Sequence, residues 1–379
     1  MSSSFGGYVL KKIWFIQPLI TNYTIPIFAE LGKYVHLTVI YSPVDTRQGF
    51  GSKANVVIPG VKLIEVPTWW PPFGKIGMVQ RGLIRILKNT QPDAVILFAN
   101  LRYLSFWSVL AWCKMRGIPV FPHGHGLYKK RNPGFLWKTI YRAVLWLSTA
   151  YICYTPSVAE SLLRLGLPEK KITVAENSLV NPFPVLPEEK TGKENGILFI
   201  GRLREGCRLD LLISAVARLR TERCLDITLH IVGDGIDAEH FKSLASGMPW
   251  VKFYGSIYDQ KKISDISRQC MAGCYPGNAG LSIVHMMSLS LPPVTHDDMV
   301  AHQGPEPSYI EQGVNGILFS HQTSDTGLVS ALHAIFDHPK QLRSLQVGAY
   351  STYKKLTEPS LAVRFVNIIT QAKISSEKQ

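Results

Sequence analysis

A tight turn at residues 276–280 stands between a short apolar run and a helical pattern of apolar residues. Leu281, Val284 and Met287 recur at the spacing of one helix face. The first backbone N–H groups of a helix have no partner within the helix and lie at the positive end of its dipole. Such a turn can bind a phosphate, but many strand–turn–helix units with a Gly-Asn turn bind nothing.

Cationic and imidazole side chains follow two other predicted strands. Arg202 comes soon after the apolar run at residues 196–200, and a guanidinium offers a diphosphate several N–H donors. His125 stands between two glycines after the apolar run at residues 118–121, where an imidazole can line a cleft. Both have a plainer explanation, a surface salt bridge for Arg202 and a structural turn for His125.

The elements that must position these residues alternate strand and helix along most of the chain, which predicts α/β domains with parallel sheets. A length of 379 residues favours two domains. Proline and charged residues at 183–195 predict a linker between a first domain at residues 1–182 and a second at residues 196–357. One predicted helix, residues 157–165, has Ser157 as its N-cap.

The charge of the chain limits its partners. A formal net charge of +14 fits nucleic acid, an anionic membrane surface or phosphorylated small molecules. Nucleic acid is disfavoured, because the sequence has no zinc-binding Cys/His spacing and no basic run of the nucleic-acid type. The apolar residues 135–146, with cations on one side, can lie on anionic lipid or can be an inter-strand helix with solvated lysines.

Other features of the composition concern the compartment. The hydrophobic content, 46%, is enough for two cores. Six scattered cysteines in apolar surroundings suit a reducing environment. The sequence has neither a signal-peptide pattern nor a run typical of a transmembrane helix. We therefore expect a cytoplasmic protein, which can rest on the cytoplasmic face of the inner membrane.

Several linked pieces of the sequence resemble the retaining glycosyltransferases of family 4. The pieces are a Gly-Arg-Leu after a strand, a Gly-Leu opening a helix, a Leu-Pro-Pro-Val strand, a Pro-Glu pair and a Gly-Val-Asn-Gly turn, at residues 201–203, 280–281, 291–294, 305–306 and 313–316. The resemblance implies the GT-B fold, an α/β fold of two Rossmann-like, doubly wound parallel-sheet domains facing a cleft. It also implies that the closing helix, within residues 358–379, crosses back to the first domain.

The resemblance implies roles for single residues. Glu306 would touch the donor sugar, and His125 would hydrogen bond to the donor sugar or the acceptor. Asn278 and the free N–H groups of Ala279 and Gly280 would face the donor. Acceptor contacts are expected near Asn22, Tyr23 and His123. The nucleotide-sugar donor is expected at Gly201, Arg202, Arg208, Gly233, Gly277, Asn278, Ala279, Gly280, Leu281 and His285. No metal or other cofactor is expected, because arginine and a helix dipole can hold the diphosphate.

Three positions depart from the family pattern. Gly277 and His285 stand where the family has two glutamates, the second associated with the ribose. Cys207 stands where the family has a lysine, and Arg208 beside it or Arg204 is the expected substitute. The variant turn, Pro-Gly-Asn-x-Gly-Leu-x-x-x-His, resembles a branch of bacterial polysaccharide glycosyltransferases.

The expected function is transfer of a sugar, with retention at the anomeric carbon, from a nucleotide sugar to a sugar or lipid-linked oligosaccharide acceptor of surface polysaccharide. One alternative is a sugar-nucleotide 2-epimerase of the same fold, which would turn over the donor without an acceptor. The Gly-Arg-Leu and Gly-Val-Asn-Gly pieces argue against it. The other alternative is a non-catalytic scaffold, which would bind the nucleotide sugar without turnover.

Overall fold

The computed structural model describes residues 11–42, 56–71 and 77–376, and the chain divides into two compact units. The first unit contains residues 1–176 and 359–379, and the second contains residues 177–358. The chain thus passes between the units at Glu176 and again at Glu358. Residues 377–379 of the predicted closing helix lie outside the described part. Among the described helices, none combines the length and the apolar character needed to span a bilayer.

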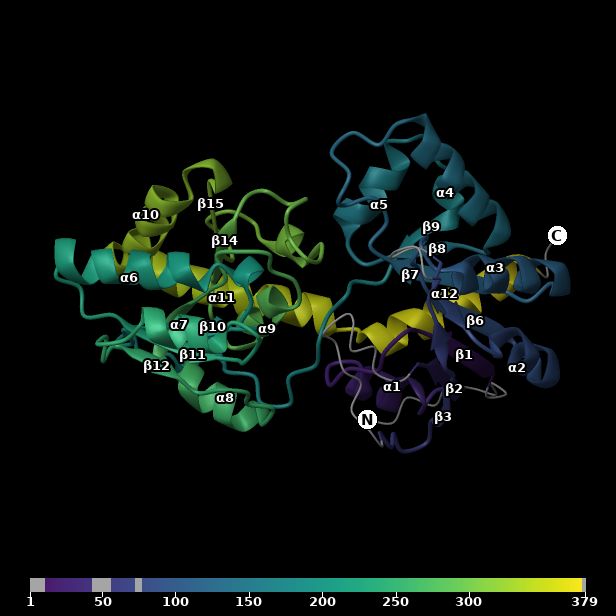
Figure 1. The fold of residues 1–379 in the computed structure, drawn as a ribbon, viewed down its shortest axis with the longest axis horizontal. Helices are drawn as coiled ribbons and strands as arrows, with labels where there is room; N and C mark the ends of the chain where they lie inside the picture. Colours follow the sequence, from purple (N-terminus) through teal and green to yellow (C-terminus); the bar gives the residue numbers. More distant parts are fainter. Residues whose placement is uncertain (1–10, 43–55, 72–76, 377–379) are drawn as a thin grey trace. The chain divides into compact units, whose positions relative to one another are not determined.

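A seven-stranded parallel sheet, in the order β3-β2-β1-β6-β7-β8-β9, forms the centre of the first unit (Figure 1). Its central strands are buried on both faces, as their apolar sequences require. A short antiparallel pair, β4 with β5, stands apart from it. The strands are β1 (Lys12–Ile16), β2 (His36–Tyr41), β3 (Lys62–Glu65), β4 (Thr68–Trp69), β5 (Val79–Gln80), β6 (Ala94–Phe98), β7 (Val120–Gly124), β8 (Tyr151–Cys153) and β9 (Ile172–Val174).

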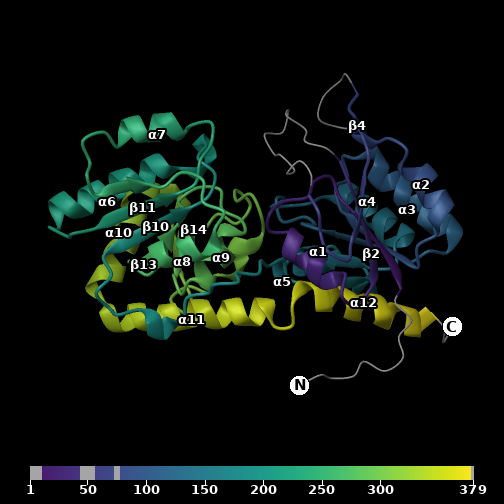
Figure 2. The same ribbon diagram turned by 90° about the horizontal axis from the view of Figure 1, so that it is seen from below.

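Helices cover both faces of this sheet, and a separate apolar cluster fills each face. One cluster joins the sheet to α2 (Leu83–Thr90), α3 (Leu104–Arg116), α4 (Phe135–Leu147) and α5 (Pro156–Leu163). The other joins it to α1 (Ile25–Leu31) and α12 (Leu361–Ser376), which run beside each other (Figure 2). A 3-10 turn, η2 (Glu169–Lys171), leads into β9.

Helix α5 corrects a local prediction. Its N-cap is Thr155 rather than Ser157, and the Thr155 hydroxyl accepts a hydrogen bond from the Val158 N–H at 3.3 Å. Pro156 occupies the first helical position, where its missing N–H costs nothing and its fixed φ suits a helix. The helix therefore begins at Pro156 and ends at Leu163.

The closing helix α12 completes the first unit. The Phe365 ring is fully buried, 5.7 Å from the Phe15 ring and 4.9 Å from the His123 ring. Arg364 forms an ion pair with Glu176, and the Ser360 hydroxyl donates to Glu30 Oε1 at 2.6 Å. Residues from the C-terminal end of the chain thus supply part of the core of the N-terminal unit.

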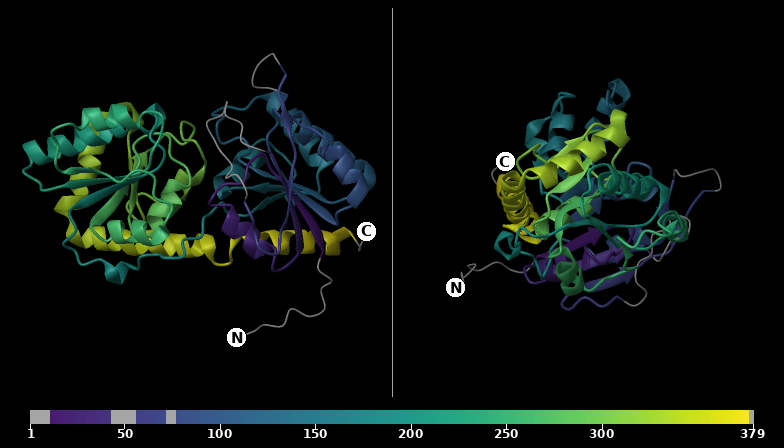
Figure 3. Two further views of the ribbon diagram at one scale, coloured as in Figure 1. Left: turned by 60° about the horizontal axis from the view of Figure 1, so that its bottom comes forward. Right: turned by 90° about the vertical axis from the view of Figure 1, so that its left-hand side faces the viewer.

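A six-stranded parallel sheet, in the order β12-β11-β10-β13-β14-β15, forms the second unit, and helices cover it on both sides (Figure 3). The strands are β10 (Gly196–Ile200), β11 (Thr228–Val232), β12 (Val251–Phe253), β13 (Cys270–Cys274), β14 (Pro293–His296) and β15 (Ile317–Phe319). The α-helices are α6 (Leu209–Glu222), α7 (Ala238–Leu244), α8 (Gln260–Ser267), α9 (Ser282–Ser288), α10 (Ser324–Asp337) and α11 (Pro339–Thr357). The 3-10 turns are η3 (Pro187–Glu189), η4 (Glu205–Cys207), η5 (Glu306–Tyr309) and η6 (His321–Thr323).

Both sheets reverse their strand order once, between β1 and β6 in the first and between β10 and β13 in the second. This topology confirms the predicted α/β class with two doubly wound parallel sheets. Ligands of such sheets bind outside the carboxyl ends of the strands at the reversal point. In the second unit, the segments at this point are the one after β10, which begins with Gly201 and Arg202, and the one after β13, which contains Gly277.

The predicted linker at residues 183–195 is attached to the second unit rather than free. Lys190 is buried, and its Nζ donates to the carbonyl oxygens of Ser267 at 2.6 Å and Cys270 at 3.1 Å. Burial lowers the pKa of Lys190 to about 8. Glu189 also pairs with Arg268 at 2.6 Å. The second unit begins still earlier, at Asn177 and not after residue 182, and the side-chain amides of Asn177 and Asn181 donate to Glu306 at 2.6 Å and Ser288 at 2.9 Å within it.

Candidate active site

The turns after β10 and β11 touch each other through backbone atoms. A Cβ placed on Gly233 would lie 1.8 Å from the Gly201 carbonyl oxygen, and one on Gly235 would lie 2.0 Å from that of Leu203. A Cβ on Gly201 would lie 2.6 Å from the Tyr275 ring. Only glycine fits at these three positions, because real Cβ atoms do not come so close to other heavy atoms. The predicted donor residues Gly201 and Gly233 therefore lie at one compact point of the second sheet.

The turn after β13 is joined in the same way to η4. The Gly277 N–H donates to the Cys207 carbonyl at 3.1 Å, and the Asn278 N–H donates to the Gly206 carbonyl at 2.8 Å. A Cβ on Gly277 would lie 2.4 Å from the Gly206 oxygen. This contact gives a physical reason for the departure from the family pattern, because a glutamate at residue 277 does not fit this arrangement. The two segments would have to separate to admit it.

His302 accepts a hydrogen bond from a backbone N–H that the sequence analysis expected to be free. The Ala279 N–H donates to His302 Nδ1 at 3.2 Å and also lies 2.9 Å from the Gly277 carbonyl oxygen. His302 Nε2 in turn lies 3.0 Å from the His296 carbonyl oxygen, to which it donates. The prediction that the Ala279 N–H is free is therefore wrong, while its place at the donor site stays a prediction. In the described part of the chain, the N–H of Gly280 has no acceptor, so it remains available to a ligand.

Glu306 is buried beside this turn, with 2% of its surface exposed. Its Oε1 accepts a hydrogen bond from Asn177 Nδ2 at 2.6 Å, while Oε2 has no partner among the described residues. A Cβ on Gly280 would lie 3.6 Å from Oε2, and one on Gly304 would lie 2.0 Å from it. Burial raises the pKa of the Glu306 carboxyl above its ordinary value. An unpartnered buried oxygen next to the Gly280 turn is a site for a hydroxyl donor.

The cations near the turns differ in their partners. Arg202 is exposed after β10. Arg208 has a left-handed backbone with φ of 53°, and its Nε lies 3.3 Å from the carboxylate of Asp210. Arg204 donates to Gln303 Oε1.

Cys207, at the position of the family's lysine, is fully buried, and burial raises its pKa, so this neutral thiol cannot take the place of a cation. Arg202 and Arg208 remain the candidates for the diphosphate.

His285 lies on α9, where it is partly exposed. Its Nε2 has no partner among the described residues, and desolvation lowers its pKa to about 4, so the ring is neutral near pH 7. A neutral imidazole nitrogen can exchange a hydrogen bond with a hydroxyl. The geometry is thus compatible with the ribose contact that the sequence predicted, without testing it.

The candidate residues of the first unit do not form one group. His123 is buried, and its ring lies between Tyr154 at 4.3 Å and Phe365 at 4.9 Å. Burial lowers its pKa to about 3. His123 is therefore a core residue of this unit, and its burial does not support the predicted acceptor contact. Asn22 and Tyr23, by contrast, are exposed before α1.

His125 lies in the turn after β7, partly exposed. Its ring packs edge-on against Tyr154 at 4.5 Å and near Tyr128 at 5.4 Å. Burial, followed by the charge of Lys129, lowers its pKa to about 4. His125 is thus a neutral, fixed imidazole at the carboxyl edge of the first sheet.

The sequence missed two residues of this site. Asn177 holds Glu306 through its amide, and the Tyr309 hydroxyl donates to the Asn177 carbonyl at 3.2 Å. His302 holds the Ala279 turn. The available signals were the Asn-Ser-Leu at residues 177–179 and a polar loop that contains two histidines before Glu306. Neither signal says which partner these side chains meet.

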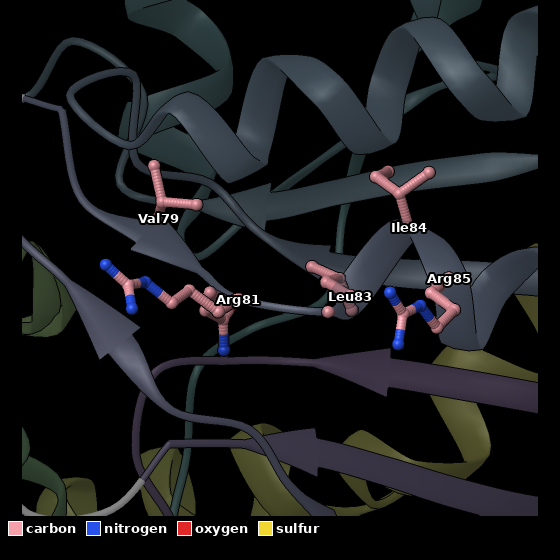
Figure 4. Close-up of a pocket in the computed structure, with 7 residues that line it drawn as sticks. Val79, Arg81, Leu83, Ile84 and Arg85 are labelled. Atoms are coloured by element: carbon pink, nitrogen blue, oxygen red, sulfur yellow. The ribbon is translucent and has the colours of Figure 1, made fainter.

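A shallow hollow of about 630 Å³ lies elsewhere, on the first unit at β5 and the start of α2. Figure 4 shows Arg81 and Arg85 beside Val79, Leu83 and Ile84 in its wall. The hollow contains none of the predicted site residues. Within residues 11–42, 56–71 and 77–376, no three His, Cys, Asp or Glu side chains are arranged to hold a metal ion.

Two family models match the chain. The model described as Glycosyltransferase Family 4 matches residues 28–179, and the model described as Glycosyl transferases group 1 matches residues 194–338. Together they span more than half of the sequence. No curated protein sequence matches the chain.

Solved structures with the same fold cover nearly the whole chain. HepE from Anabaena, in complex with UDP and glucose, is 15% identical with a TM-score of 0.64, and the match covers 97% of this chain and 100% of HepE. The sucrose-phosphate synthase of Thermosynechococcus elongatus is 14% identical with a TM-score of 0.69, over 96% of this chain and 100% of that one. The lipopolysaccharide outer core galactosyltransferase WaaB is 17% identical with a TM-score of 0.59, over 92% and 99%.

Proposed function

We propose that this chain, which belongs to the family 4 glycosyltransferases of GT-B fold, is a retaining hexosyltransferase that uses a nucleotide-sugar donor. Its acceptor is a sugar or a lipid-linked oligosaccharide of a surface polysaccharide, such as O-antigen, capsule or exopolysaccharide. Two similar proteins support this proposal. HepE binds UDP and glucose, and WaaB is a galactosyltransferase of the lipopolysaccharide outer core.

The observation that carries the proposal is the contact between the glycine turns of the second unit. These turns bring Arg202 and Arg208 to the point where the strand order reverses, with the Gly280 N–H before α9. Fixed N–H donors and guanidinium groups suit the two phosphates of a nucleoside diphosphate. They need little rearrangement when charge develops on the leaving group.

Glu306 is the proposed contact to the sugar. Its free Oε2 lies next to Gly280 and can accept a hydrogen bond from a sugar hydroxyl, while Asn177 holds Oε1. His285 is the proposed partner of the ribose. The proposed diphosphate-binding turn at Gly280 and the proposed sugar-binding carboxylate of Glu306 thus lie next to each other in the second unit, although they come from different segments of the chain.

The proposed reaction needs no pair of carboxylates. The acceptor oxygen bonds to the anomeric carbon on the face from which the diphosphate leaves, so the configuration is retained. The acceptor proton passes to the departing phosphate oxygen as the carbon–oxygen bond of the donor breaks. A glycosidase that acts through a covalent intermediate requires two carboxylates instead.

The first unit supplies the acceptor side in this proposal. Asn22, Tyr23 and the neutral His125 follow β1 and β7 at the carboxyl edge of its sheet. His125 can donate or accept a hydrogen bond at neutral pH, since its pKa is lowered to about 4. We propose that it positions a hydroxyl and does not act as a cation.

The reaction is also proposed to proceed without a metal ion, because the arginines provide the positive charge at the diphosphate. Turnover is expected to be the same, within about twofold, with and without a chelator such as EDTA. A loss of activity with EDTA that returns with added Mg²⁺ or Mn²⁺ would refute metal independence.

The donor site is tested by heat unfolding with UDP, GDP, dTDP and ADP. A ligand at about one hundred times its Kd stabilises the native protein by roughly 2.7 kcal/mol, which raises the Tm by several degrees. Arg202→Ala is expected to weaken binding about tenfold or more. Arg218→Ala is the matched control, because Arg218 is a partly exposed arginine of the same unit, on α6, whose Nε pairs with Glu222 at 3.0 Å. No Tm shift with any nucleotide would refute the donor site.

Turnover separates the transferase from its alternatives. UDP-sugars incubated with a panel of alkyl glycosides are expected to give a glycoside product, with NMR showing the anomeric configuration of the donor. Epimerised donor without an acceptor would indicate the 2-epimerase. Nucleotide binding with no product for any donor and acceptor would indicate the scaffold.

A further inference from the structure

One part of the chain carries most of its excess charge. Residues 66–159 contain twelve Lys and Arg and a single acidic residue, Asp93, and so account for eleven of the fourteen net positive charges. All of these residues belong to the first unit. The proposed donor site, with its diphosphate-binding arginines, lies in the second unit and does not use this charge.

Helix α4, towards the C-terminal end of this basic segment, exposes large apolar side chains at both of its ends. Phe135, Leu136 and Trp146 are exposed over 80%, 67% and 66% of their surfaces. Phe135, Thr139, Arg142 and Trp146 are all exposed and follow one another at three- and four-residue steps, so they lie on one face of the helix. With thirteen residues, α4 is about 20 Å long, and this exposed face, apolar at its ends and polar between them, follows most of its length.

The opposite face of α4 is firmly attached to the unit. Tyr141, Val144 and Leu145 are buried in the core, and α4 packs beside α3 (Figure 1). Lys171 Nζ donates to the carbonyl oxygens of Leu145 at 2.6 Å and Ser148 at 2.9 Å at the end of the helix. The exposed aromatic and aliphatic side chains therefore stand on a fixed helix that is already packed on its other side.

Cations lie close to these exposed apolar side chains. Lys129, Lys130 and Arg131 are exposed in the loop before α4. Lys130 Nζ lies 4.8 Å from the centre of the Trp137 ring, and Lys114 Nζ lies 5.4 Å from that of Trp146. No Asp or Glu occurs between Asp93 and Glu160 in the sequence, so no carboxylate from α3, α4 or the loop between them offsets these charges.

We propose that α4 and the loop before it form a docking surface for an anionic phospholipid bilayer. Lys129, Lys130, Arg131 and Arg142 would contact lipid phosphates, and Phe135, Leu136 and Trp146 would enter the boundary between headgroups and acyl chains. The exposed apolar side chains favour lipid over a nucleic-acid duplex, because the phosphate backbone of a duplex needs the cations alone. The surface itself does not depend on the proposed reaction; only its use in reaching a lipid-linked acceptor rests on that function.

The test is cosedimentation of the full chain with vesicles of phosphatidylcholine alone and of equal parts phosphatidylcholine and phosphatidylglycerol. The wild type is expected to bind the anionic vesicles at least about tenfold more tightly, with weaker binding at high salt. Phe135→Ser/Leu136→Ser and Lys130→Glu/Arg131→Glu are each expected to weaken this binding about tenfold or more. The control Lys261→Glu/Lys262→Glu, exposed on α8 of the second unit, is expected to stay within about twofold.

Specific outcomes would overturn the proposal. Equal binding to both kinds of vesicle, no binding at all, or an equal loss in the α8 control would each refute the surface. A loss with the charge variant but not with the apolar variant would refute insertion by Phe135 and Leu136. An RNA duplex that competes with the vesicles and binds as tightly would refute lipid as the partner.

Folding is checked independently by the melting curve of each variant, followed by circular dichroism. Because the vesicles contain neither donor nor acceptor, this result does not depend on turnover. Vesicle binding without glycosyl transfer would leave the docking surface standing and refute only the proposed reaction.

Discussion

The carboxyl edges of the two sheets are built differently, although both sheets reverse their strand order once and in the same way. In the second unit, turns meet through backbone atoms, and no Cβ fits at Gly233 or Gly277. In the first unit, the turns present side chains: Tyr23 is 48% exposed and His125 packs against Tyr154.

This difference corresponds to what each unit is proposed to bind. A diphosphate is common to all nucleotide sugars, and fixed backbone and guanidinium donors suit a group that does not vary. Acceptors vary in shape, and side chains on turns can change without disturbing the sheet beneath them. The comparison predicts that substitutions in the turns of the second unit are far more damaging than those in the first.

The largest effect is expected for Gly233→Ala, because its Cβ would lie 1.8 Å from the Gly201 carbonyl oxygen. The backbone must shift to relieve this contact, at a cost of about 3 kcal/mol or more in the free energy of unfolding. Nucleotide-induced stabilisation is expected to disappear, and turnover to fall by about a thousandfold. Calorimetry with and without UDP measures the first effect and product formation the second.

The control in the first unit is Gly134→Ala. Nothing lies within 4 Å of the place that an added Cβ would occupy, and the φ of −79° at this residue suits any side chain. This variant should keep the Tm and the turnover of the wild type. Equal damage from both substitutions would remove the proposed contrast between the units.

A smaller effect is expected for Glu306→Gln, which should raise the stability of the protein and lower its activity. Burial raises the pKa of Glu306, so the native protein binds a proton more tightly than the unfolded chain does. Stability therefore falls as the pH rises from the ordinary carboxyl pKa through the raised value, and at neutral pH the buried charge is destabilising. Gln keeps an oxygen for Asn177 without this charge, so its Tm at neutral pH should be higher.

Turnover of the same variant is expected to fall about a hundredfold, since an amide is a weaker acceptor than a carboxylate for a sugar hydroxyl. The matched control is Glu311→Gln, an exposed residue of the same unit, which should change neither quantity. A lower Tm with full activity would mean that Glu306 is a structural residue only.

The smallest expected difference between the two units is in how much stability each loses in acid. Burial lowers the pKa of four histidines in the second unit, to about 4 for His230, His285 and His302 and about 3 for His296. In the first unit the same holds for two, His123 and His125. Unfolded histidines take up protons near pH 6.5, so the stability from these groups is present above that pH. It is lost as the pH falls towards about 4.

Hydrogen exchange, corrected for its intrinsic pH dependence, should show the second unit opening more than the first when the pH is lowered from about 7 to about 5. His296→Phe should reduce this sensitivity, because neither ring nitrogen of His296 has a partner in the described chain. If the first unit opened more than the second at the lower pH, the attribution of acid sensitivity to these buried histidines would be contradicted.

The local elements were predictable because they depend on periodicity. The helical pattern at residues 135–146 appears as α4, and that beginning at Leu281 appears as α9. The N-cap predicted for α5 was wrong. A threonine precedes Pro156 and a serine follows it, and because proline favours the first helical position, the threonine becomes the N-cap.

The partners within the site were not predictable from the sequence. The glycine at residue 277 could be noted as a departure, but its reason is the backbone of Gly206 and Cys207, far away in the chain. His302 and Ala279 meet for the same reason. Spacing predicts which face of an element a residue occupies; it does not predict which turn of another strand lies opposite.

Helix α12 has a consequence for the order in which the chain can fold during synthesis. N-terminal domains usually fold as they leave the ribosome. Here the first unit cannot close its apolar face over Phe15 and His123 until Phe365 has been made, after the whole of the second unit. The second unit, continuous from residue 177 to residue 358, has all its residues earlier. During synthesis, one face of the first sheet therefore stays uncovered until the residues of α12 have been made.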